Sequence, residues 1–578
     1  MDFEIELSKD GYRVLKFNMG NKKIYLGSKY NQEREINKII ESFKPFTSND
    51  NYIVVGLSFG EHVKELIEKT AASTRILVIE VNTEWLEFCN KDEEIKKIIN
   101  NERVIIAKDE VEVKKFFREY ITQMNVNNLN IGYCCNYDIL FKEGLKEIYS
   151  VIRNESNRII TDKNTSLYFG ETWFNTLLSN LKYMTKATPI NFLRNKYKNK
   201  PAIIVSAGPS LNKNIHELKN VCGNALILSG GRTLRPLKEN DIEPSIVGVV
   251  DAGEVSYKLV EGFIENTKAP LLFYDGTNNL VVDKHNGNKI FSSNNELLDD
   301  IYGFSIDKLS SGGSIAHVLT VFAAYIGCSP IVFIGQDLAY TGEKGHAECA
   351  ENNWQKLEFD NYKKKDDLYV KDINGDLVRT SVILDSYRVV LEEIIESFPE
   401  IEFINATEGG AFIKGASVKS LKSVIDGFEK QEIIPIDEYL NSEDKTEETI
   451  KILEKTVNSL DKTINLCKRG KHLLDDFYKA YRSKVNGNLS KYINELDKID
   501  KSIRENMCNL SVIESQLFET TYSIENSNEF LVLSIDTKGK IFEKNISKNR
   551  AIYDGLEGVC KKSFIEVKKI IKEMNLRE

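Results

Sequence analysis

Short apolar runs alternate with amphipathic stretches along the first part of the chain. The runs YIVVG, RILVI and RVIIA each lead into a stretch with helical spacing of apolar residues. Before them, YRVLKFNMGNKKIYLGS has two alternating runs around a turn, which predicts two strands. Strands that alternate with helices indicate a parallel sheet covered by helices. We therefore expect residues 1–185 to form one α/β domain.

The same alternation returns after a polar, basic stretch, KATPINFLRNKYKNK, which we interpret as a connector over residues 186–200. The second region starts at Pro201 and has helices between several of its strands. It predicts a second α/β domain, with a mostly parallel sheet, over residues 186–428. The strands expected in it are Ile203–Val205, Ala225–Leu228, Ile246–Val250, Leu271–Phe273 and Pro330–Ile334.

From about residue 430 apolar residues recur at steps of three and four, as in EETIKILEKTVNSLDKTINLCKRGKHLLDDFYKAYRSK. This spacing predicts long amphipathic helices, and we expect an α-helical domain over residues 429–578. Such helices could pack as an antiparallel bundle. They could equally contact a partner, including a second copy of the chain.

The composition narrows the class of protein. The shares of hydrophobic (41%) and charged (29%) residues are those of a soluble globular protein. A length of 578 residues predicts three or four domains. A net charge of −9 without an arginine-rich stripe argues against a nucleic-acid binder. Nine cysteines, an odd number without a C-x-x-C pair, indicate reduced thiols. Since neither a signal peptide nor a membrane span is visible in the sequence, we expect a cytoplasmic protein.

The stretch PAIIVSAGPSLNKNI, residues 201–215, is the first candidate for chemistry. Gly208 follows an apolar strand and would let a ligand approach the backbone closely. A helix that begins near Ser210 would point free N–H groups at an anion such as phosphate. An ordinary tight turn, with Ser210 as the helix cap, explains the motif equally well.

Two later strands end in comparable residues. The stretch LSGGRTL places Ser229, Gly230 and Gly231 at the end of one strand, and Asp251 ends another. In open parallel sheets, ligands bind at the carboxyl ends of the strands where the strand order reverses. Asp251 could instead cap a helix.

The longest motif is KLSSGGSIAHVLTVFAAYIGCSPIVFIGQDLAYTGEKGHAE. A Ser- and Gly-rich loop enters an apolar helix, and the strand after it delivers Gln336, Asp337 and Tyr340. His346 follows in a polar loop, where a histidine is often only solvated, but a neighbouring ligand-binding strand end favours a functional role. His317 lies within the helix, where we expect it to belong to the core or to serve in capping.

Two further motifs are weaker. In FINATEGGAFIKGA, Glu408 and the glycines after it could close one wall of a pocket or form a simple turn. In the first region, residues 56–60 (GLSFG) follow a strand, and Glu80 ends the next one. This is the layout of a nucleotide- or S-adenosylmethionine-binding turn, although a fold without ligand explains it equally well. The sequence contains neither a Cys/His metal-ligand pattern, a Walker A motif nor a serine nucleophile elbow.

With these motifs in order, residues 200–420 resemble the central domain of the motility accessory factor (Maf) family of bacterial flagellin glycosyltransferases. The matching stretches are PAIIVSAGPSLNKNI, SGGSIAHVLTVFAAYIGCSPIVFIGQDLAYTG with HAE after it, and NATEGGAFIKGA. The flanking regions resemble the family in their pattern of secondary structure, with a Rossmann-like N-terminal domain and a helical C-terminal domain. The resemblance implies that a sialyltransferase-like central domain transfers a nonulosonic, sialic-acid-like sugar from a CMP donor onto Ser or Thr of flagellin.

The resemblance also implies where the donor binds. The acceptor base would be His346 or a carboxylate, Asp251 or Glu408. N–H, hydroxyl and phenol groups would hold the leaving phosphate without any cofactor or protein-bound metal, although Mg²⁺ is compatible with the chemistry. The chain departs from its sialyltransferase relatives at Gly230-Gly231, where they carry an amide residue. The implied donor-binding residues are Ala207, Gly208, Pro209, Ser210, Ser229, Gly230, Gly231, Ser311, Gly312, Gly313, Ser314, Gln336, Asp337 and Tyr340.

Two other functions fit the same sequence. Pterin diphosphokinases share a related central fold and would need ATP and Mg²⁺, with Asp251 and Asp337 facing the metal. A flagellin chaperone or assembly factor would bind flagellin through its helical region and would not bind CMP.

Overall fold

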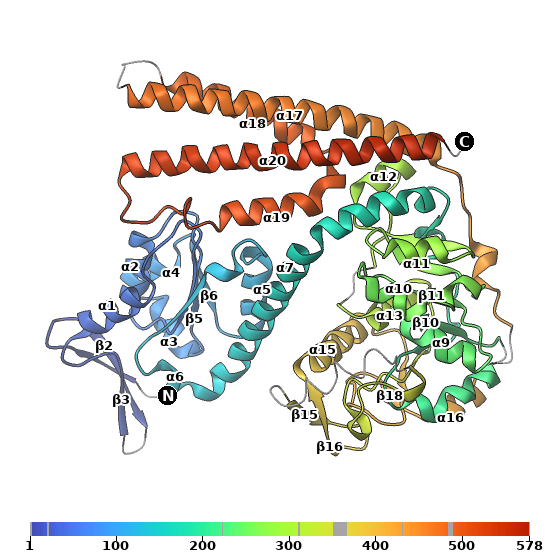
Figure 1. Cartoon of the computed structure of the whole chain (residues 1–578). Helices are drawn as coiled ribbons and strands as arrows, with labels where there is room; N and C mark the ends of the chain where they lie inside the picture. The colour runs from blue at the N-terminus through green and yellow to red at the C-terminus, as the bar shows by residue number, and fades with distance from the viewer. Residues whose placement is uncertain are drawn as a thin grey trace. The chain divides into compact units, whose positions relative to one another are not determined.

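The computed structural model describes residues 3–19, 22–221, 223–309, 312–350, 367–429, 432–483 and 489–576. The chain forms two compact units. Figure 1 shows the whole chain, coloured by residue number from the N-terminus to the C-terminus. The first unit consists of Met1–Gly170, Ile464–Ile503 and Gln516–Val559, and the second of Glu171–Thr463, Arg504–Ser515 and Cys560–Glu578. The helices after residue 428 thus contribute to both units, and the division into three domains at 185 and 428 stays a prediction.

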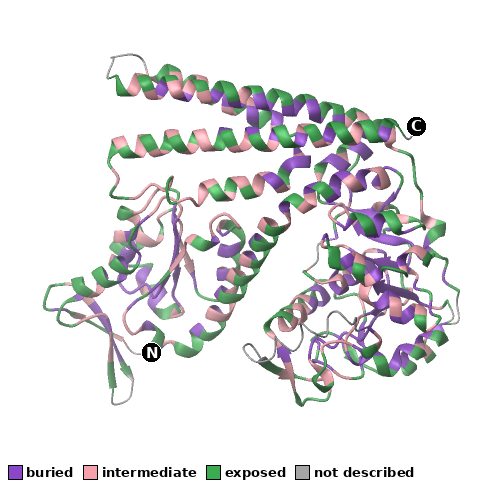
Figure 2. Cartoon of the chain, viewed as in Figure 1, coloured by how far each residue is buried: buried purple, intermediate pink, exposed green. Residues whose placement is uncertain are grey.

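The first unit contains the α/β fold expected from the alternating pattern. Its four parallel strands stand in the order β6-β5-β4-β7, and the two central strands, β5 and β4, are buried throughout (Figure 2). An antiparallel three-stranded sheet, β1-β2-β3, precedes them. The strands are β1 (Phe3–Leu7), β2 (Arg13–Met19), β3 (Lys22–Leu26), β4 (Asn51–Val55), β5 (Ile76–Ile79), β6 (Val104–Ala107) and β7 (Leu129–Tyr133). The helices are α1 (Gln32–Ser42), α2 (Glu61–Lys69), α3 (Thr83–Cys89), α4 (Glu93–Ile99), α5 (Glu110–Tyr120), α6 (Tyr137–Leu140) and the first part of α7 (Lys142–Met184).

The second unit is built around a parallel sheet of nine strands, in the order β18-β17-β14-β9-β10-β11-β12-β13-β8. From β9 the chain adds strands in one direction as far as β13, and it then returns to place β14 on the other side of β9. The strand order therefore reverses between β9 and β14. The strands are β8 (Thr188–Pro189), β9 (Ala202–Val205), β10 (Leu226–Gly230), β11 (Ile246–Gly248), β12 (Leu271–Tyr274), β13 (Lys289–Ser292), β14 (Ile331–Ile334), β17 (Phe403–Asn405) and β18 (Ser417–Val418).

Helices cover both faces of this sheet, which is why its central strands β9 and β14 are apolar at every position. Ile203 and Val205 of β9 pack into one core cluster, and Ile204 between them packs into the other. A separate antiparallel hairpin is formed by β15 (Asp367–Lys371) and β16 (Leu377–Ser381). The helices are α8 (Leu211–Asn214), α9 (Gly231–Glu239), α10 (Glu254–Val260), α11 (Asn279–Lys284), α12 (Glu296–Tyr302), α13 (Ile315–Tyr325), α15 (Val382–Glu396) and α16 (Leu421–Asp426).

The stretch 186–200 is not the polar connector that we predicted. Thr188–Pro189 forms β8, the edge strand beside β13. Ile190 and Leu193 are fully buried, and Tyr197 is 2% exposed. The apolar residues are spaced among lysines and asparagines, so the stretch has polar average composition although it lies against the sheet.

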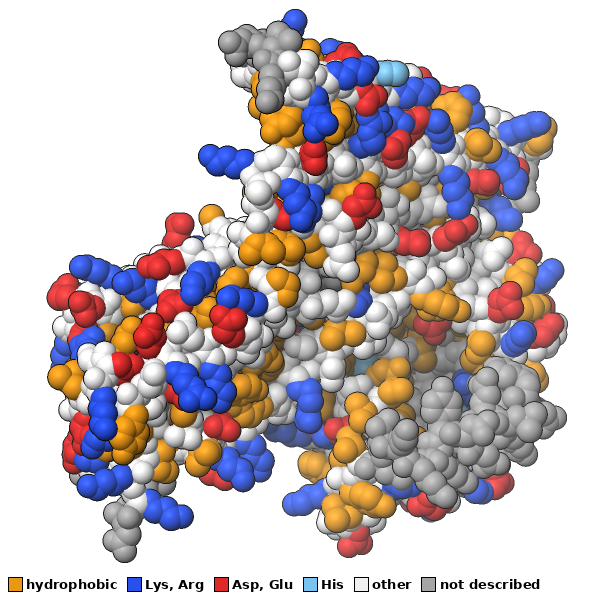
Figure 3. Space-filling model, turned by 60° about the vertical axis from the view of Figure 1, so that its left-hand side comes forward, with side chains coloured by type: hydrophobic (Ala, Val, Ile, Leu, Met, Phe, Trp, Pro, Cys, Tyr) orange, Lys and Arg blue, Asp and Glu red, His pale blue; other side chains and the backbone are white. Residues whose placement is uncertain are grey.

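The long helices predicted after residue 430 are present as α17 (Thr446–Arg482), α18 (Ser490–Met507), α19 (Glu514–Glu525) and α20 (Lys538–Asn575). In the first unit, Lys471 of α17 pairs with Asp554 and Glu557 of α20, at 2.6 and 2.7 Å. Figure 3 shows Lys and Arg interspersed with Asp and Glu over one face of the molecule. None of the described helices combines the length and the apolar character that a membrane crossing requires.

Candidate active site

The carboxyl ends of β9 and β14 form the point where the strand order of the large sheet reverses. Val205 pairs with Ile334 at the end of the two strands, and the backbone contact continues beyond them. Ser206 donates its N–H to the Ile334 carbonyl (2.9 Å), and Gly208 donates to the Gly335 carbonyl (2.7 Å). This is the position at which open parallel sheets bind ligands.

Gly208 and Asp337, 129 positions apart in the sequence, touch at this point. A Cβ built on Gly208 would lie 2.5 Å from Asp337 Oδ1 and 2.5 Å from the Gly335 carbonyl oxygen, so only glycine fits there. Ser210 donates its N–H to Asp337 Oδ2 (3.0 Å) and its hydroxyl to Oδ1 (2.5 Å). Asp337 is 1% exposed, and burial raises its pKa although the Ser210 hydrogen bonds oppose that effect.

These contacts change the role of Ser210. Its two donors, which the sequence pattern directed at a nucleotide, bind the Asp337 carboxylate instead. Pro209 and Ser210 are buried, and the helix after them, α8, has four residues before it continues as a 3₁₀ helix, Ile215–Val221. The partly exposed backbone of Ala207 and Gly208 is the part of the turn that a ligand can reach.

The loops after β14 and β17 line the other side of this point. Gln336 is 5% exposed and its amide oxygen accepts the Ser206 hydroxyl. Tyr340 lies under the guanidinium group of Arg379, 4.3 Å from the ring centroid. Glu408 is exposed, and its carbonyl oxygen accepts from Lys213 Nζ (2.6 Å). Two residues later, the Gly410 backbone packs against Asp337, and Ala411 donates its N–H to the Asp337 carbonyl (2.7 Å). The structure thus brings these predicted residues together around Asp337.

The small residues at the end of β10 serve packing. Ser229 is fully buried, and its hydroxyl bonds the Gly230 carbonyl (2.9 Å) and the Thr233 hydroxyl (3.0 Å), so it has no surface to offer a ligand. A Cβ on Gly230 would lie 2.9 Å from Ile315 of α13, and one on Gly231 would lie 3.0 Å from Val260 of α10. The two glycines therefore let neighbouring helices approach the strand closely.

Arg232 follows these glycines and was not among the predicted residues. It is the second residue of α9, whose N-cap, Gly230, has no side chain to cap the free N–H groups. Burial and the charge of Arg235 lower the pKa of Arg232. The basic residue in the sequence SGGRT, directly after strand-end glycines, was the signal that could have found it.

His346 lies close to Arg232 and to the turn after β9. Its neighbour Ala347 donates its N–H to the Ala207 carbonyl (2.9 Å). Burial and the positive charge of Arg232 lower the pKa of His346 to about 4, which leaves its imidazole neutral at pH 7. A cation, uncapped helix N–H groups and a neutral imidazole thus surround the partly exposed Ala207–Gly208 backbone.

The Ser- and Gly-rich loop lies before α13, and Ser311 in it falls outside the described residues. Ser314 caps α13 by accepting the Ala316 N–H (3.4 Å). Gly312 has no room for a side chain, since a Cβ would lie 2.5 Å from Val390, whereas Gly313 is exposed and a Cβ on it would make only an ordinary contact with Tyr387, at 3.7 Å. His317 is fully buried, as predicted, with Nε2 2.9 Å from the Tyr387 carbonyl oxygen.

Two carboxylates end the neighbouring strands β11 and β12. Asp251 is exposed to solvent, yet the protein around it excludes enough water to raise its pKa. Burial raises the pKa of Asp275 to about 6. A shifted pKa at a strand end makes Asp275 a candidate site residue, the second after Arg232 that we did not predict. The sequence FYDGTNN, a carboxylate directly after a strand, carried the signal for Asp275.

Asp251 and Asp337 do not converge on one position. Their strands, β11 and β14, are separated by β10 and β9, which is three strand spacings or about 14 Å. Asp337 is in addition occupied by Ser210. Across the described part of the chain, no three His, Cys, Asp or Glu side chains gather closely enough to hold a metal ion.

The turn after β4 in the first unit is filled by the protein itself. Gly56 has a positive φ of 99°, and a Cβ there would lie 2.6 Å from the ring of Tyr137. Glu80 is 1% exposed and accepts the Tyr137 hydroxyl (2.6 Å) and the Leu57 N–H (3.2 Å). Both features that indicated a nucleotide-binding turn are therefore explained by internal packing.

Comparisons with known proteins bear on the whole chain and on the second unit. A family model described as "6-hydroxymethylpterin diphosphokinase MptE-like" matches residues 175–343. No curated protein sequence matches the chain. Among solved structures, a Maf glycosyltransferase from Magnetospirillum magneticum AMB-1 is similar over 99% of this chain and 93% of its own, with 13% sequence identity and a TM-score of 0.55. The structural neighbour is thus a protein of the kind that the sequence motifs indicated, and this chain has its fold along almost its full length.

Proposed function

We propose that this protein is a glycosyltransferase that moves a nonulosonic sugar from a CMP donor to a Ser or Thr hydroxyl of flagellin, in the cytoplasm. The observation that carries the proposal is the electropositive surrounding of the Ala207–Gly208 backbone at the strand-order reversal, formed by Arg232 and the uncapped start of α9. The structural similarity to a glycosyltransferase supports the reaction class. The sugar, the nucleotide and the acceptor rest on the resemblance of the motifs.

The donor phosphate would bind between the Ala207–Gly208 backbone and Arg232. Phosphate is stabilised by free helix N–H groups and by charge-assisted hydrogen bonds from arginine. As the bond between the sugar carbon and the phosphate oxygen breaks, negative charge grows on the leaving CMP, and a fixed cation stabilises that charge more than it stabilises the intact donor. The chemistry requires no metal, and Mg²⁺ would be compatible with it.

The acceptor hydroxyl loses its proton as it bonds to the sugar carbon. His346 is neutral and can take up that proton. The phosphate bound beside Arg232 offsets the charge that lowers the pKa of His346, so the imidazole becomes a stronger base once the donor is present. Asp251 is the alternative base, because its carboxylate is exposed on the same edge of the sheet.

Isothermal titration with CMP tests the binding part of the proposal. We expect Arg232→Gln to weaken CMP binding by about 10-fold or more, the range of one hydrogen bond to a charged group. Arg235→Gln is the matched control, because Arg235 lies three residues further along α9 and donates to the Cys349 carbonyl (2.9 Å). Equal affinities of the two variants would contradict the assignment of the phosphate site.

The transfer itself is tested by the intact mass of flagellin after incubation with the protein and a CMP-nonulosonate. We expect one or more mass steps of a nine-carbon sugar, which are lost in Arg232→Gln. CMP binding without any mass step would refute flagellin transfer. No CMP binding together with flagellin binding would favour the assembly factor.

The family match at residues 175–343 favours a second candidate, a pterin diphosphokinase that uses ATP and Mg²⁺. The distance of about 14 Å between the strands that carry Asp251 and Asp337 argues against these carboxylates sharing one metal ion. Thermal stabilisation by ATP with Mg²⁺, but not by CMP, would establish this candidate over the glycosyltransferase.

A further inference from the structure

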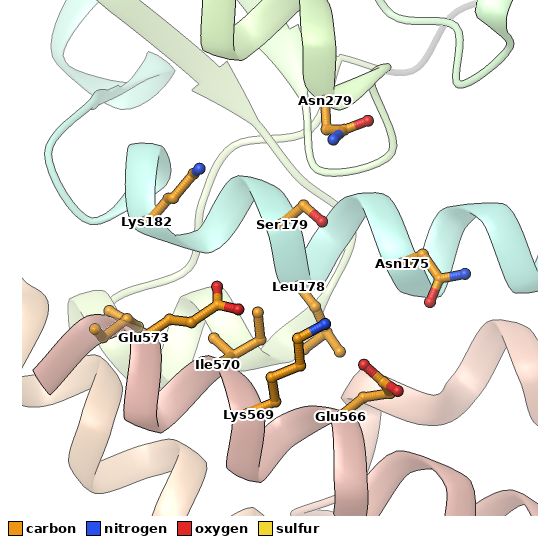
Figure 4. Close-up of a pocket in the computed structure, with 10 residues that line it drawn as sticks. Asn175, Leu178, Ser179, Lys182, Asn279, Glu566, Lys569, Ile570 and Glu573 are labelled. Atoms are coloured by element: carbon orange, nitrogen blue, oxygen red, sulfur yellow. The ribbon is translucent and has the colours of Figure 1, made fainter. Parts of the chain in front are cut away.

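A cavity of about 330 Å³ lies in the second unit between α7, α11 and α20, apart from the strand ends β9 and β14. Its size is at the lower end of the range of ligand pockets in proteins. Figure 4 shows Glu566, Lys569 and Ile570 of α20 directed toward α7. The lining residues are Asn175, Leu178, Ser179, Lys182, Asn279, Glu566, Lys569, Ile570, Glu573 and Met574.

The charged groups of this cavity do not neutralise one another. Among the described residues, no ion pair involves Glu566, Lys569 or Glu573. Lys182 Nζ lies 3.8 Å from Asp283, which does not line the cavity, and 4.6 Å from the centre of the Tyr183 ring. Two cations and two carboxylates thus face a small volume, where Glu566, Lys569 and Glu573 keep their hydrogen-bonding capacity for water or for a ligand and Lys182 shares its charge with Asp283.

Neutral polar groups and an apolar surface complete the lining. Asn175, Ser179 and Asn279 add amide and hydroxyl groups. Leu178 and Met574, each 4% exposed, contribute apolar surface. Many hydrogen-bonding groups of both kinds beside an apolar surface are suited to a sugar ring, which has hydroxyl groups around its rim and C–H groups on its faces.

The cavity has a fixed place in the fold. Asn279 begins α11, directly after the loop at the carboxyl end of β12. Asn180 of α7, which is fully buried, donates to the carbonyls of Asp275 (3.1 Å) and Thr277 (2.8 Å) in that loop. An ion pair between Lys562 and Glu171 (2.6 Å) joins α20 to α7. The loop after β12, which leads into Asn279 and is held by α7, lies at the same edge of the sheet as the candidate active site, three strand spacings or about 14 Å from β9.

We propose that this cavity binds an acidic monosaccharide, with the sugar carboxylate held by Lys182 and Lys569 and the hydroxyls by Glu566, Glu573 and the neutral polar groups. The lysines select a carboxylate over a neutral sugar. The two glutamates leave the lining without net charge, which disfavours a multiply charged phosphate. This inference goes beyond the proposed transfer and does not depend on it.

Isothermal titration of the full chain with two acidic sugars tests the proposal, each beside an uncharged relative. The pairs are N-acetylneuraminate with its methyl ester, and glucuronate with glucose. We expect at least one acid to bind at least 10-fold more tightly than its uncharged relative. Lys569→Ala should weaken that binding at least 10-fold, and Lys572→Ala, on the same helix but outside the lining, should not change it.

Three outcomes would overturn the proposal: no binding of either acid, equal binding of the uncharged relatives, or a loss of binding in Arg232→Gln but not in Lys569→Ala. The last outcome would place the sugar at the strand ends. CMP titration of Lys569→Ala separates the two proposals, because we expect its CMP affinity to equal that of the unmodified protein. Unchanged circular dichroism of Lys569→Ala ensures that lost binding is not lost folding.

Discussion

The fit between Gly208 and Asp337 makes a strong prediction about stability. In Gly208→Ala the new methyl group would lie 2.5 Å from Asp337 Oδ1 and from the Gly335 carbonyl oxygen. Carbon and oxygen atoms in proteins usually stay about 3.3 Å or more apart, so the overlap is about 0.8 Å. The Gly335 carbonyl cannot retreat without losing the Gly208 N–H, which it accepts at 2.7 Å. The turn after β9 must therefore move.

The size of the effect follows from two contributions. Overpacking of a tight site costs about 1–3 kcal/mol. Weakening of the Gly208–Gly335 hydrogen bond adds about 0.5–1.5 kcal/mol. We expect Gly208→Ala to lower the free energy of unfolding of the second unit by about 2–4 kcal/mol, measured by urea titration. CMP affinity should fall as well, because the displaced backbone is the proposed phosphate contact.

Gly313→Ala is the matched control, since a Cβ on Gly313 would be 3.7 Å from Tyr387, an ordinary contact. We expect its stability to stay within about 0.5 kcal/mol of the unmodified protein. If Gly208→Ala were as stable as Gly313→Ala, the reasoning from close approach at the strand-order reversal would be wrong.

Three further predictions concern ionisable groups. Burial raises the pKa of Glu80 to about 7 from its usual 4.5, so the folded state holds this proton more tightly, and the group's contribution to the free energy of unfolding is lost as pH rises from 4.5 to 7, by up to about 3 kcal/mol. Glu80→Gln should remove that loss in urea titrations at the two pH values, and an unchanged pH dependence would contradict the reasoning. Binding of CMP should raise the pKa of His346 from about 4 by one unit or more, as followed by NMR of the imidazole, whereas an unchanged value would separate His346 from the phosphate. Asp337→Asn should destabilise the second unit by about 1–3 kcal/mol, because its amide cannot accept both Ser210 donors; thermal unfolding at an unchanged temperature would show that these hydrogen bonds contribute nothing.

The architecture was largely visible in the sequence because each buried strand carries a continuous apolar run. The strands expected at Ile203–Val205, Leu271–Phe273 and Pro330–Ile334 agree with β9, β12 and β14 to within one residue. The sequence did not reveal β8, which is a two-residue edge strand, or the antiparallel hairpin of β15 and β16. A two-residue strand is too short to show a period, and the hairpin strands, DLYVK and LVRTS, mix polar with apolar residues and so lack a continuous apolar run.

Residues of the candidate site were less predictable, because a motif names residues without saying which way their polar atoms point. The AGPS turn was correctly placed at the end of a strand, yet the donors of Ser210 bind Asp337. The glycines after β10 looked like a ligand contact and serve helix packing. Arg232 and Asp275 follow strand ends directly and were visible there as local signals, but the cavity beside α20 depends on chain segments that meet only in the folded protein, so no local pattern could find it.

The segments of the two compact units alternate along the polypeptide. This alternation affects folding during synthesis and the choice of truncated fragments. The first unit is complete only when residue 559 has left the ribosome, and the second requires segments that come after it, including Cys560–Glu578. Neither unit can finish folding while its amino-terminal part alone is exposed, so both must wait for late contacts. A fragment that ends at residue 428 would keep every strand of the large sheet but lack the α20 wall of the sugar cavity.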